Sequence, residues 1–221
     1  MTEVVNKLTD KHRQRIIQRH KSAIERYGYK PSALFWKDKA VQDLRFSLFL
    51  DWVERYRPAL AENAVPSVLD VGCGFADLYK YFKNHGVEID YTGLDVCPDM
   101  TFAAGNMHPE VTLLTGELFD FDLAENGYDW VLLSGALNEI VDDTGDYAFS
   151  VIRKMYELSK HGVVFNLLNQ AHAWTFQAQD LMSFDVNKVK NYCQSFCLHV
   201  EVRMDYLPHD FTVFLQKSRR G

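Results

Sequence analysis

The chain has 221 residues, of which 47% are hydrophobic, and its formal net charge is −6. This length and composition suit one domain with a sizeable core, while the negative charge argues against broad binding to nucleic acid or to an anionic membrane. No apolar run is long enough to span a bilayer, and the N-terminus lacks the apolar core of a signal peptide, so we expect a cytoplasmic location.

Residues 1–58 are predicted to form a helical appendage or lid, rather than an independent domain, on a main domain at 59–221. A break at 28–32 separates a polar helix at 3–27 from a second helix at about 38–57. The basic side chains of the first helix offer a contact for RNA or another acidic partner, but a solvated helix face explains them as well, and we favour the solvated face. These side chains are Lys7, Lys11, Arg13, Arg15, Arg19 and Lys21.

Two glycines, Gly72 and Gly74, directly follow a short apolar run, and a helical pattern comes after them. This order is typical of the first strand, tight turn and helix of a doubly wound sheet. In turns of the type G-x-G-x-x-G a third glycine faces a pyrophosphate, but Asp77 takes its position here. A carboxylate there would repel a diphosphate, and Asp70 adds a second negative charge. The turn therefore favours a cationic or zwitterionic ligand without phosphates, such as S-adenosylmethionine.

Alternating strand and helix patterns continue to the end of the chain. The second strand ends at Asp95, an acid that can accept hydrogen bonds from both ribose hydroxyls of an adenosine. A short turn at 208–210 separates the last two strands and forces them to be antiparallel. The predicted strands are 67–71, 88–94, 111–115, 128–134, 162–168, 197–206 and 211–217, and the predicted helices are 75–85, 98–107, 145–160 and 183–195.

These segments together resemble motifs I to IV of the class I S-adenosylmethionine-dependent methyltransferases, over about residues 66–217. The stretch from Asp70 to Ala76 matches the usual D-x-G-x-G-x-G, except that Ala76 replaces the third glycine. The resemblance implies an α/β, Rossmann-like, doubly wound seven-stranded sheet of order 3-2-1-4-5-7-6. Such a sheet is mostly parallel and ends in an antiparallel C-terminal hairpin.

The resemblance also implies a site for S-adenosylmethionine beyond the carboxyl ends of the strands. The residues that would line the methionine moiety are Asp70, Gly72, Cys73 and Gly74. Those expected around the adenosine are Asp95 at the ribose, Val96 against the adenine, and Gly116, Glu117 and Leu118 at the adenine edge. Glu117 would accept a hydrogen bond from the exocyclic amine, and Ser134 and Gly135 would lie beneath the sulfonium.

The segment from Tyr27 to Phe46 is similar to the same region of a group of small bacterial class I methyltransferases that have no assigned acceptor. Its shared residues include Trp36, Gln42 and Arg45. We expect the segment to fold over the cofactor, with Arg45 pairing with the methionine carboxylate. The alternative places Arg45 on a polar helix face, paired with Asp43 or with solvent.

The four cysteines do not form a zinc-binding pattern, since Cys193 and Cys197 have no second ligand pair near them in the sequence. Cys73 lies between the two turn glycines, so its backbone should matter more than its sulfur. We therefore predict reduced thiols, with Cys97 as the fourth, and no metal site.

Methyl transfer is a displacement in which the cofactor supplies the leaving group, so the protein mainly orients and desolvates the reactants. No catalytic constellation is recognisable, and the candidates for a base or acceptor contact are His172, Tyr206, His209 and Asn138. We expect Tyr206 and His209 to approach the acceptor pocket; the alternative for His209 is a solvated surface turn.

The sequence Ser134-Gly135-Ala136-Leu137 differs from the Asn/Asp-Pro-Pro-Tyr of many enzymes that methylate amino groups of nucleic acids. This difference and the negative net charge favour a small-molecule acceptor. One alternative is an RNA or protein acceptor that uses the basic N-terminal helix, and another is a non-catalytic cofactor-binding module. The pattern leaves the oligomeric state open.

Overall fold

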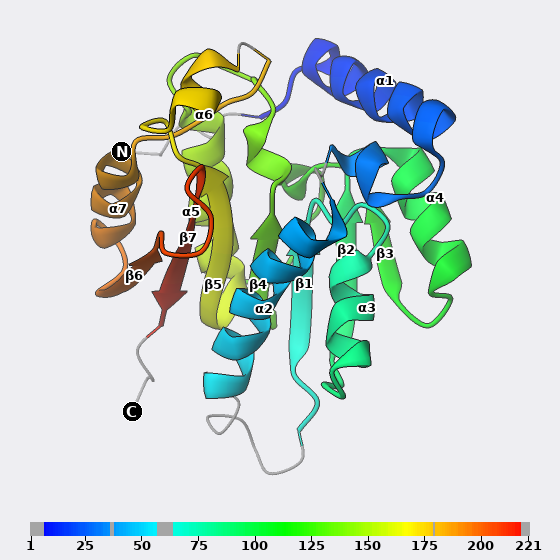
Figure 1. Cartoon of the computed structure of the whole chain (residues 1–221). Helices are drawn as coiled ribbons and strands as arrows, with labels where there is room; N and C mark the ends of the chain where they lie inside the picture. The colour runs from blue at the N-terminus through cyan, green and yellow to red at the C-terminus, as the bar shows by residue number, and fades with distance from the viewer. Residues whose placement is uncertain (1–6, 36–37, 57–63, 179, 218–221) are drawn as a thin grey trace.

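The computed structural model describes residues 7–35, 38–56, 64–178 and 180–217. Its centre is a seven-stranded sheet of order β3-β2-β1-β4-β5-β7-β6, in which β7 alone runs opposite to the other strands (Figure 1). The predicted fold class and strand order are therefore confirmed. The strands are β1 Ser67–Val71, β2 Asp90–Asp95, β3 Thr112–Thr115, β4 Tyr128–Ser134, β5 Ser159–Leu168, β6 His199–Arg203 and β7 Asp210–Gln216.

Helices cover both faces of this sheet. The longer ones are α1 Asp10–Tyr27, α2 Lys39–Tyr56, α3 Asp77–Asn84, α4 Pro98–Met107, α5 Asp146–Leu158 and α7 Val186–Gln194. A short helix, α6 Ala173–Gln177, and the 3-10 turns η1 Pro31–Leu34, η3 Leu118–Asp120 and η4 Ala136–Asn138 lie in the connections. No helix in the described ranges is long and apolar enough to cross a membrane.

The strands alternate their side chains between two buried clusters, as expected of a sheet covered on both sides. On one face, Val131 and Phe165 pack with residues of α5 and α7, including Ile152 and Val189. On the other face the packed residues include Val68, Leu132, Phe214 and, from α2 and α3, Phe49, Trp52 and Phe82. The central strands are thus fixed from both sides, and their carboxyl ends form a rigid edge.

Several element boundaries differ from the sequence prediction. The first helix begins at Asp10, where the Thr9 hydroxyl accepts a hydrogen bond from the His12 amide at 3.2 Å. Strand β5 begins at Ser159, so the end of the predicted helix 145–160 is already strand. The short helix α6 was not predicted, because five residues are too few for a helical repeat to show. Figure 1 shows α1 and α6 lying over the edge where the parallel strands end.

Candidate active site

A cavity of about 720 Å³ lies at the carboxyl ends of the parallel strands. It brings together most of the predicted cofactor residues: Arg45, Asp70, Gly72, Cys73, Asp95, Val96, Gly116, Glu117, Leu118, Ser134 and Gly135. The predicted catalytic candidates Asn138, His172 and His209 also line it. Gly74 and Tyr206 are absent from its lining, and each of them has a structural role described below.

The glycine turn forms the floor of this cavity. Gly72 has a φ of +75°, and a Cβ atom at this position would overlap the Cβ of Ala136, so only glycine fits. The amides of Gly72 and Cys73 both donate to the Leu94 carbonyl, at 2.7 and 3.0 Å, which ties the turn to the end of β2. Ala76, in place of the third glycine, also has a positive φ of 58°. The turn thus keeps the left-handed conformation that its glycine-rich pattern predicts, even at the alanine.

The Asp95 carboxylate is held rigidly at the tip of β2. Its two oxygens accept hydrogen bonds from the amides of Gly74 and Cys97, each at 2.9 Å. Burial raises the pKa of Asp95, and these backbone donors oppose the rise. A carboxylate oxygen has two lone pairs, so each oxygen retains one for a ligand. The geometry suits the predicted ribose contact, which stays a prediction.

Asp70 is a second buried acid in the cavity lining. The Tyr91 hydroxyl donates to its Oδ2 at 2.6 Å. Burial raises the pKa of Asp70 to about 7, and the negative charges of Asp95 and Asp77 push in the same direction. A cationic ligand would favour the ionised form and lower this pKa again. The part of the cavity beside Asp70 therefore suits a ligand with positive charge.

Helix α2 contributes two buried polar residues, Gln42 and Arg45, to the cavity. The Gln42 amide donates to Asp77 Oδ2 at 3.0 Å, and the Arg45 guanidinium pairs with the buried Asp210 at the start of β7. The expected alternative for Arg45 is therefore wrong, since it is neither solvated nor paired with Asp43. That acid binds Lys39 at 2.7 Å instead. The pairing of Arg45 with a methionine carboxylate stays a prediction, and Trp36 lies outside the described residues.

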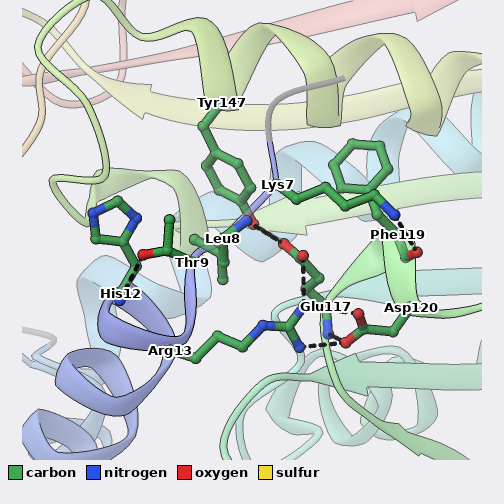
Figure 2. Close-up of polar contacts among 9 residues, drawn as sticks. All are labelled: Lys7, Leu8, Thr9, His12, Arg13, Glu117, Phe119, Asp120 and Tyr147. Atoms are coloured by element: carbon green, nitrogen blue, oxygen red, sulfur yellow. Dashed lines mark hydrogen bonds and ion pairs between the residues drawn. The ribbon is translucent and has the colours of Figure 1, made fainter. Parts of the chain in front are cut away.

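Glu117 has a role that the sequence did not indicate. Figure 2 shows three donors converging on its buried carboxylate. Arg13 binds Oε1 at 2.6 Å, while the Leu8 amide and the Tyr147 hydroxyl donate to Oε2 at 3.1 and 3.3 Å. Arg13 also pairs with Asp120. Three of the roughly four acceptor positions of the carboxylate are thus filled from within the chain, which leaves one for the expected adenine amine.

The other arginines of α1 also bind acids of the main domain. Arg15 and Arg19 contact the two carboxylate oxygens of Glu139 at 3.4 and 3.0 Å, and Arg19 reaches Asp180 at 3.4 Å. The favoured interpretation of this helix as a solvated basic face is therefore wrong for Arg13, Arg15 and Arg19. In addition, the α1 segment contributes Leu8, Ile16, Arg19 and His20 to the cavity wall. The amphipathic spacing of residues in this helix does not indicate these long-range contacts.

Aromatic side chains line the end of the cavity beside β5 and β7. The His209 ring lies 5.2 Å from that of Trp174 and 5.8 Å from that of His172, measured between centroids. Nδ1 of His172 accepts a hydrogen bond from the Trp174 amide at 3.3 Å, so in the neutral ring the proton resides on Nε2. His172 would therefore face a ligand as a donor. Asn138 also lines this end, and its Oδ1 is buried without a hydrogen-bond partner in the described part of the chain.

Tyr206 does not take the place that was expected of it. Its hydroxyl shares a 2.7 Å hydrogen bond with Thr212 of β7, and its ring packs against the cluster beneath α2. Burial raises the pKa of Tyr206 well above its usual range. Tyr206 therefore supports the sheet and is not positioned as a base in the cavity.

The two residues expected beneath the sulfonium are held by Asn166 of β5. Its Oδ1 accepts from the Gly135 amide at 2.9 Å, and its Nδ2 donates to the Ser134 hydroxyl at 3.2 Å. Asn166 is fully buried, so these contacts fix the turn after β4 from below. Sequence reasoning missed Asn166 because it lies within an otherwise apolar strand pattern.

Comparisons with known proteins agree with this architecture. Residues 68–162 match a family model described as "Methyltransferase domain". The Mycobacterium tuberculosis protein named "Putative methyltransferase Rv1506c" is 24% identical over 160 residues, which cover 69% of this chain and 93% of that one.

Two solved structures illustrate the likeness in fold. Magnesium protoporphyrin IX methyltransferase from Synechocystis PCC 6803, solved with bound SAH, superposes with a TM-score of 0.62 at 13% identity, covering 80% of this chain and 84% of that one. An S-adenosylmethionine-dependent methyltransferase from Clostridium acetobutylicum gives a TM-score of 0.61 at 9% identity, covering 78% and 90%. The family match shows a methyltransferase domain over residues 68–162, and the solved structures show that the chain shares the fold of S-adenosylmethionine-dependent methyltransferases.

Proposed function

We propose that the chain transfers the methyl group of S-adenosylmethionine to a small-molecule acceptor inside the cavity described above. The observation that carries this proposal is that both α1 and α6 contribute side chains to the cavity wall. A volume of about 720 Å³ falls in the range of roughly 300–1,000 Å³ that is typical of small-molecule sites. Such a chamber suits a cofactor and a compact acceptor side by side.

The charges along the cavity support one orientation of the cofactor. Asp95 would hold the ribose, and Asp70 and Asp77 would face the ammonium and sulfonium charges. Arg45 would meet the carboxylate of the methionine moiety, since it lines the same wall as Gln42 and Asp77. Ser134 and Gly135, fixed by Asn166, would then lie near the reacting methyl group.

The bound cofactor supplies an electrophilic methyl group and its own leaving group. The residues at the aromatic end would orient the acceptor and keep water away from the reacting atoms. There, the buried Oδ1 of Asn138 would accept a hydrogen bond from the attacking N–H or O–H, and the Nε2–H group of His172 would donate a hydrogen bond to the acceptor. His209 remains the candidate for a proton acceptor, because it lines the same end of the cavity.

An RNA or protein acceptor receives less support. That alternative used the basic N-terminal helix, but Arg13, Arg15 and Arg19 are engaged by Glu117, Asp120, Glu139 and Asp180. These arginines would have to leave their carboxylates before they could contact a phosphate backbone.

The proposal can be tested by supplying the enzyme with methyl-labelled S-adenosylmethionine and a cell extract divided into small molecules, RNA and protein. We expect label to appear in the small-molecule fraction, and the Asp95→Ala variant to reduce it. Label confined to RNA or to protein would contradict the small-molecule assignment while leaving the methyltransferase activity in place.

A further inference from the structure

Helix α1 places one polar side chain in the cavity that the assignments above do not use. His20 lines the cavity, and its Nδ1 is buried without a hydrogen-bond partner among the described residues. Its ring packs against that of Phe35 with the centroids 5.2 Å apart. A buried ring nitrogen without a partner is costly, so this position is better explained if a ligand supplies the missing hydrogen bond.

The ring lies in the neighbourhood of Asp95. Both residues line the same cavity, and the proximity of His20 also lowers the pKa of Asp95, against the larger effect of burial. Leu34, which precedes Phe35, approaches the glycine turn: a Cβ atom on Gly74 would lie 3.0 Å from its Cδ2. The α1–η1 segment thus covers the glycine turn at the end of the cavity where Asp95 lies.

Two sets of ion pairs hold α1 in this place. Arg13 binds Glu117 and Asp120 beyond β3, and Arg15 and Arg19 bind Glu139 beyond β4. These anchors lie on two different strand ends, so the helix is fixed at more than one point along its length. His20 directly follows Arg19, and its position is therefore set by the protein before any ligand binds.

We propose that His20 is a cofactor-binding residue that contacts a ribose hydroxyl together with Asp95. The proposal rests on the proposed function, because it takes Asp95 as the ribose acceptor. Each oxygen of the Asp95 carboxylate has one lone pair left and can only accept. A hydroxyl can donate to Asp95 and still interact with Nδ1 of His20. Because the single proton of the hydroxyl goes to Asp95, the hydroxyl accepts from Nδ1, and the contact takes the neutral form of the ring that carries its proton on Nδ1.

The chain offers a matched control for His20 on the same helix. Nδ1 of His12 is also buried without a partner among the described residues, but His12 does not line the cavity. We would measure S-adenosylhomocysteine binding by calorimetry for the wild type, His20→Phe, His20→Asn and His12→Phe. His20→Phe keeps a ring and removes the nitrogens, whereas His20→Asn retains a polar atom near the position of Nδ1.

We expect His20→Phe to weaken S-adenosylhomocysteine roughly tenfold, as the loss of one buried hydrogen bond implies. His20→Asn should recover part of this loss, and His12→Phe should bind like the wild type. Analogues that lack the 2′- or the 3′-hydroxyl make the test specific, because the effect of His20→Phe should disappear for one of them.

The outcomes separate the two proposals. If S-adenosylhomocysteine fails to bind the wild type, or if Asp95→Ala has no effect, the proposed cofactor site itself is wrong. If the wild type binds and depends on Asp95, but His20→Phe binds equally well, the assignment of His20 is overturned. An equal loss for both deoxy analogues and for the full ligand would overturn the ribose contact.

Discussion

Arg13 and Glu117 lie 104 positions apart in the chain, yet their side chains meet at 2.6 Å. The Glu117 side chain is only 2% exposed, and that of Arg13 is 24% exposed. The pair joins the first turn of α1 to the end of β3, beside the cavity. Removing one partner from a buried pair costs more than the pair contributes, because the remaining charge stays buried.

We therefore predict that Arg13→Met loosens α1 from the main domain. The partial exposure of Arg13 reduces the cost from that of a fully buried pair to about 1–3 kcal/mol. Hydrogen exchange should show faster exchange in the amides of α1, and Lys21→Met, at an exposed position on the same helix, is the control. Unchanged exchange in α1 would show that the Arg13 contacts do not hold the helix in place.

Asp70 should give the free energy of unfolding a particular dependence on pH. Its pKa is about 7 in the folded chain, above the ordinary value of 3.8, so between these values the folded protein holds a proton that the unfolded chain releases. Stability attributable to this group therefore falls as the pH rises from about 4 to 7, by up to about 1.4 kcal/mol per unit.

Urea unfolding at several pH values would test this, with Asp70→Asn as the comparison. The variant should lose less stability than the wild type as the pH rises from 5 to 7. Parallel profiles for the two proteins would contradict the raised pKa of Asp70. The comparison with the variant is needed because burial also raises the pKa values of Asp95 and Asp210.

Gly72 and Gly86 form a matched pair for testing the glycine turn. Both have positive φ angles, +75° and +73°, but a Cβ on Gly72 would overlap Ala136, whereas nothing lies within 4 Å of one on Gly86. Gly86→Ala should cost about 1–2 kcal/mol from its backbone conformation alone. Gly72→Ala should cost a further 1–3 kcal/mol or so from overpacking. Equal losses in urea unfolding would mean that the contact between Gly72 and Ala136 is not close.

The pair of Arg45 and Asp210 requires a double variant to separate binding from folding. Arg45→Met alone would leave the buried Asp210 without its cation, so it would destabilise the fold whatever its role in binding. Combining Arg45→Met with Asp210→Asn removes most of that penalty. If Arg45 contacts the methionine carboxylate, this double variant should bind S-adenosylhomocysteine weakly and methylthioadenosine nearly as the wild type does. An equal loss for both ligands would instead assign Arg45 to the support of the fold.

The sheet and the cofactor end of the site could be predicted because their signals are local. Apolar alternation marks the strands, and the sequence from Asp70 to Ala76 combines strand, turn and helix in one short segment. The same strand pattern predicts an acid, Asp95, at the end of β2, and the structure places Asp95 in the cavity as expected.

The rest depends on contacts that no short segment contains. Arg45 and Asp210 are 165 positions apart, and nothing in their local sequence marks them as partners. The sequence presents the basic residues of α1 as a solvated face, because helical periodicity does not show which acids of the folded domain will face them. Asn166 was missed for a related reason, since its polar role appears only when β4 and β5 lie side by side.

The most direct test of the account is calorimetry of the purified protein with S-adenosylhomocysteine and with NAD. We predict that S-adenosylhomocysteine binds, that NAD does not, and that Asp95→Ala weakens the binding by about 1–3 kcal/mol, because the ribose hydroxyls lose a charged acceptor. Binding of NAD as tight as that of S-adenosylhomocysteine, or binding that is indifferent to Asp95→Ala, would contradict the site described here.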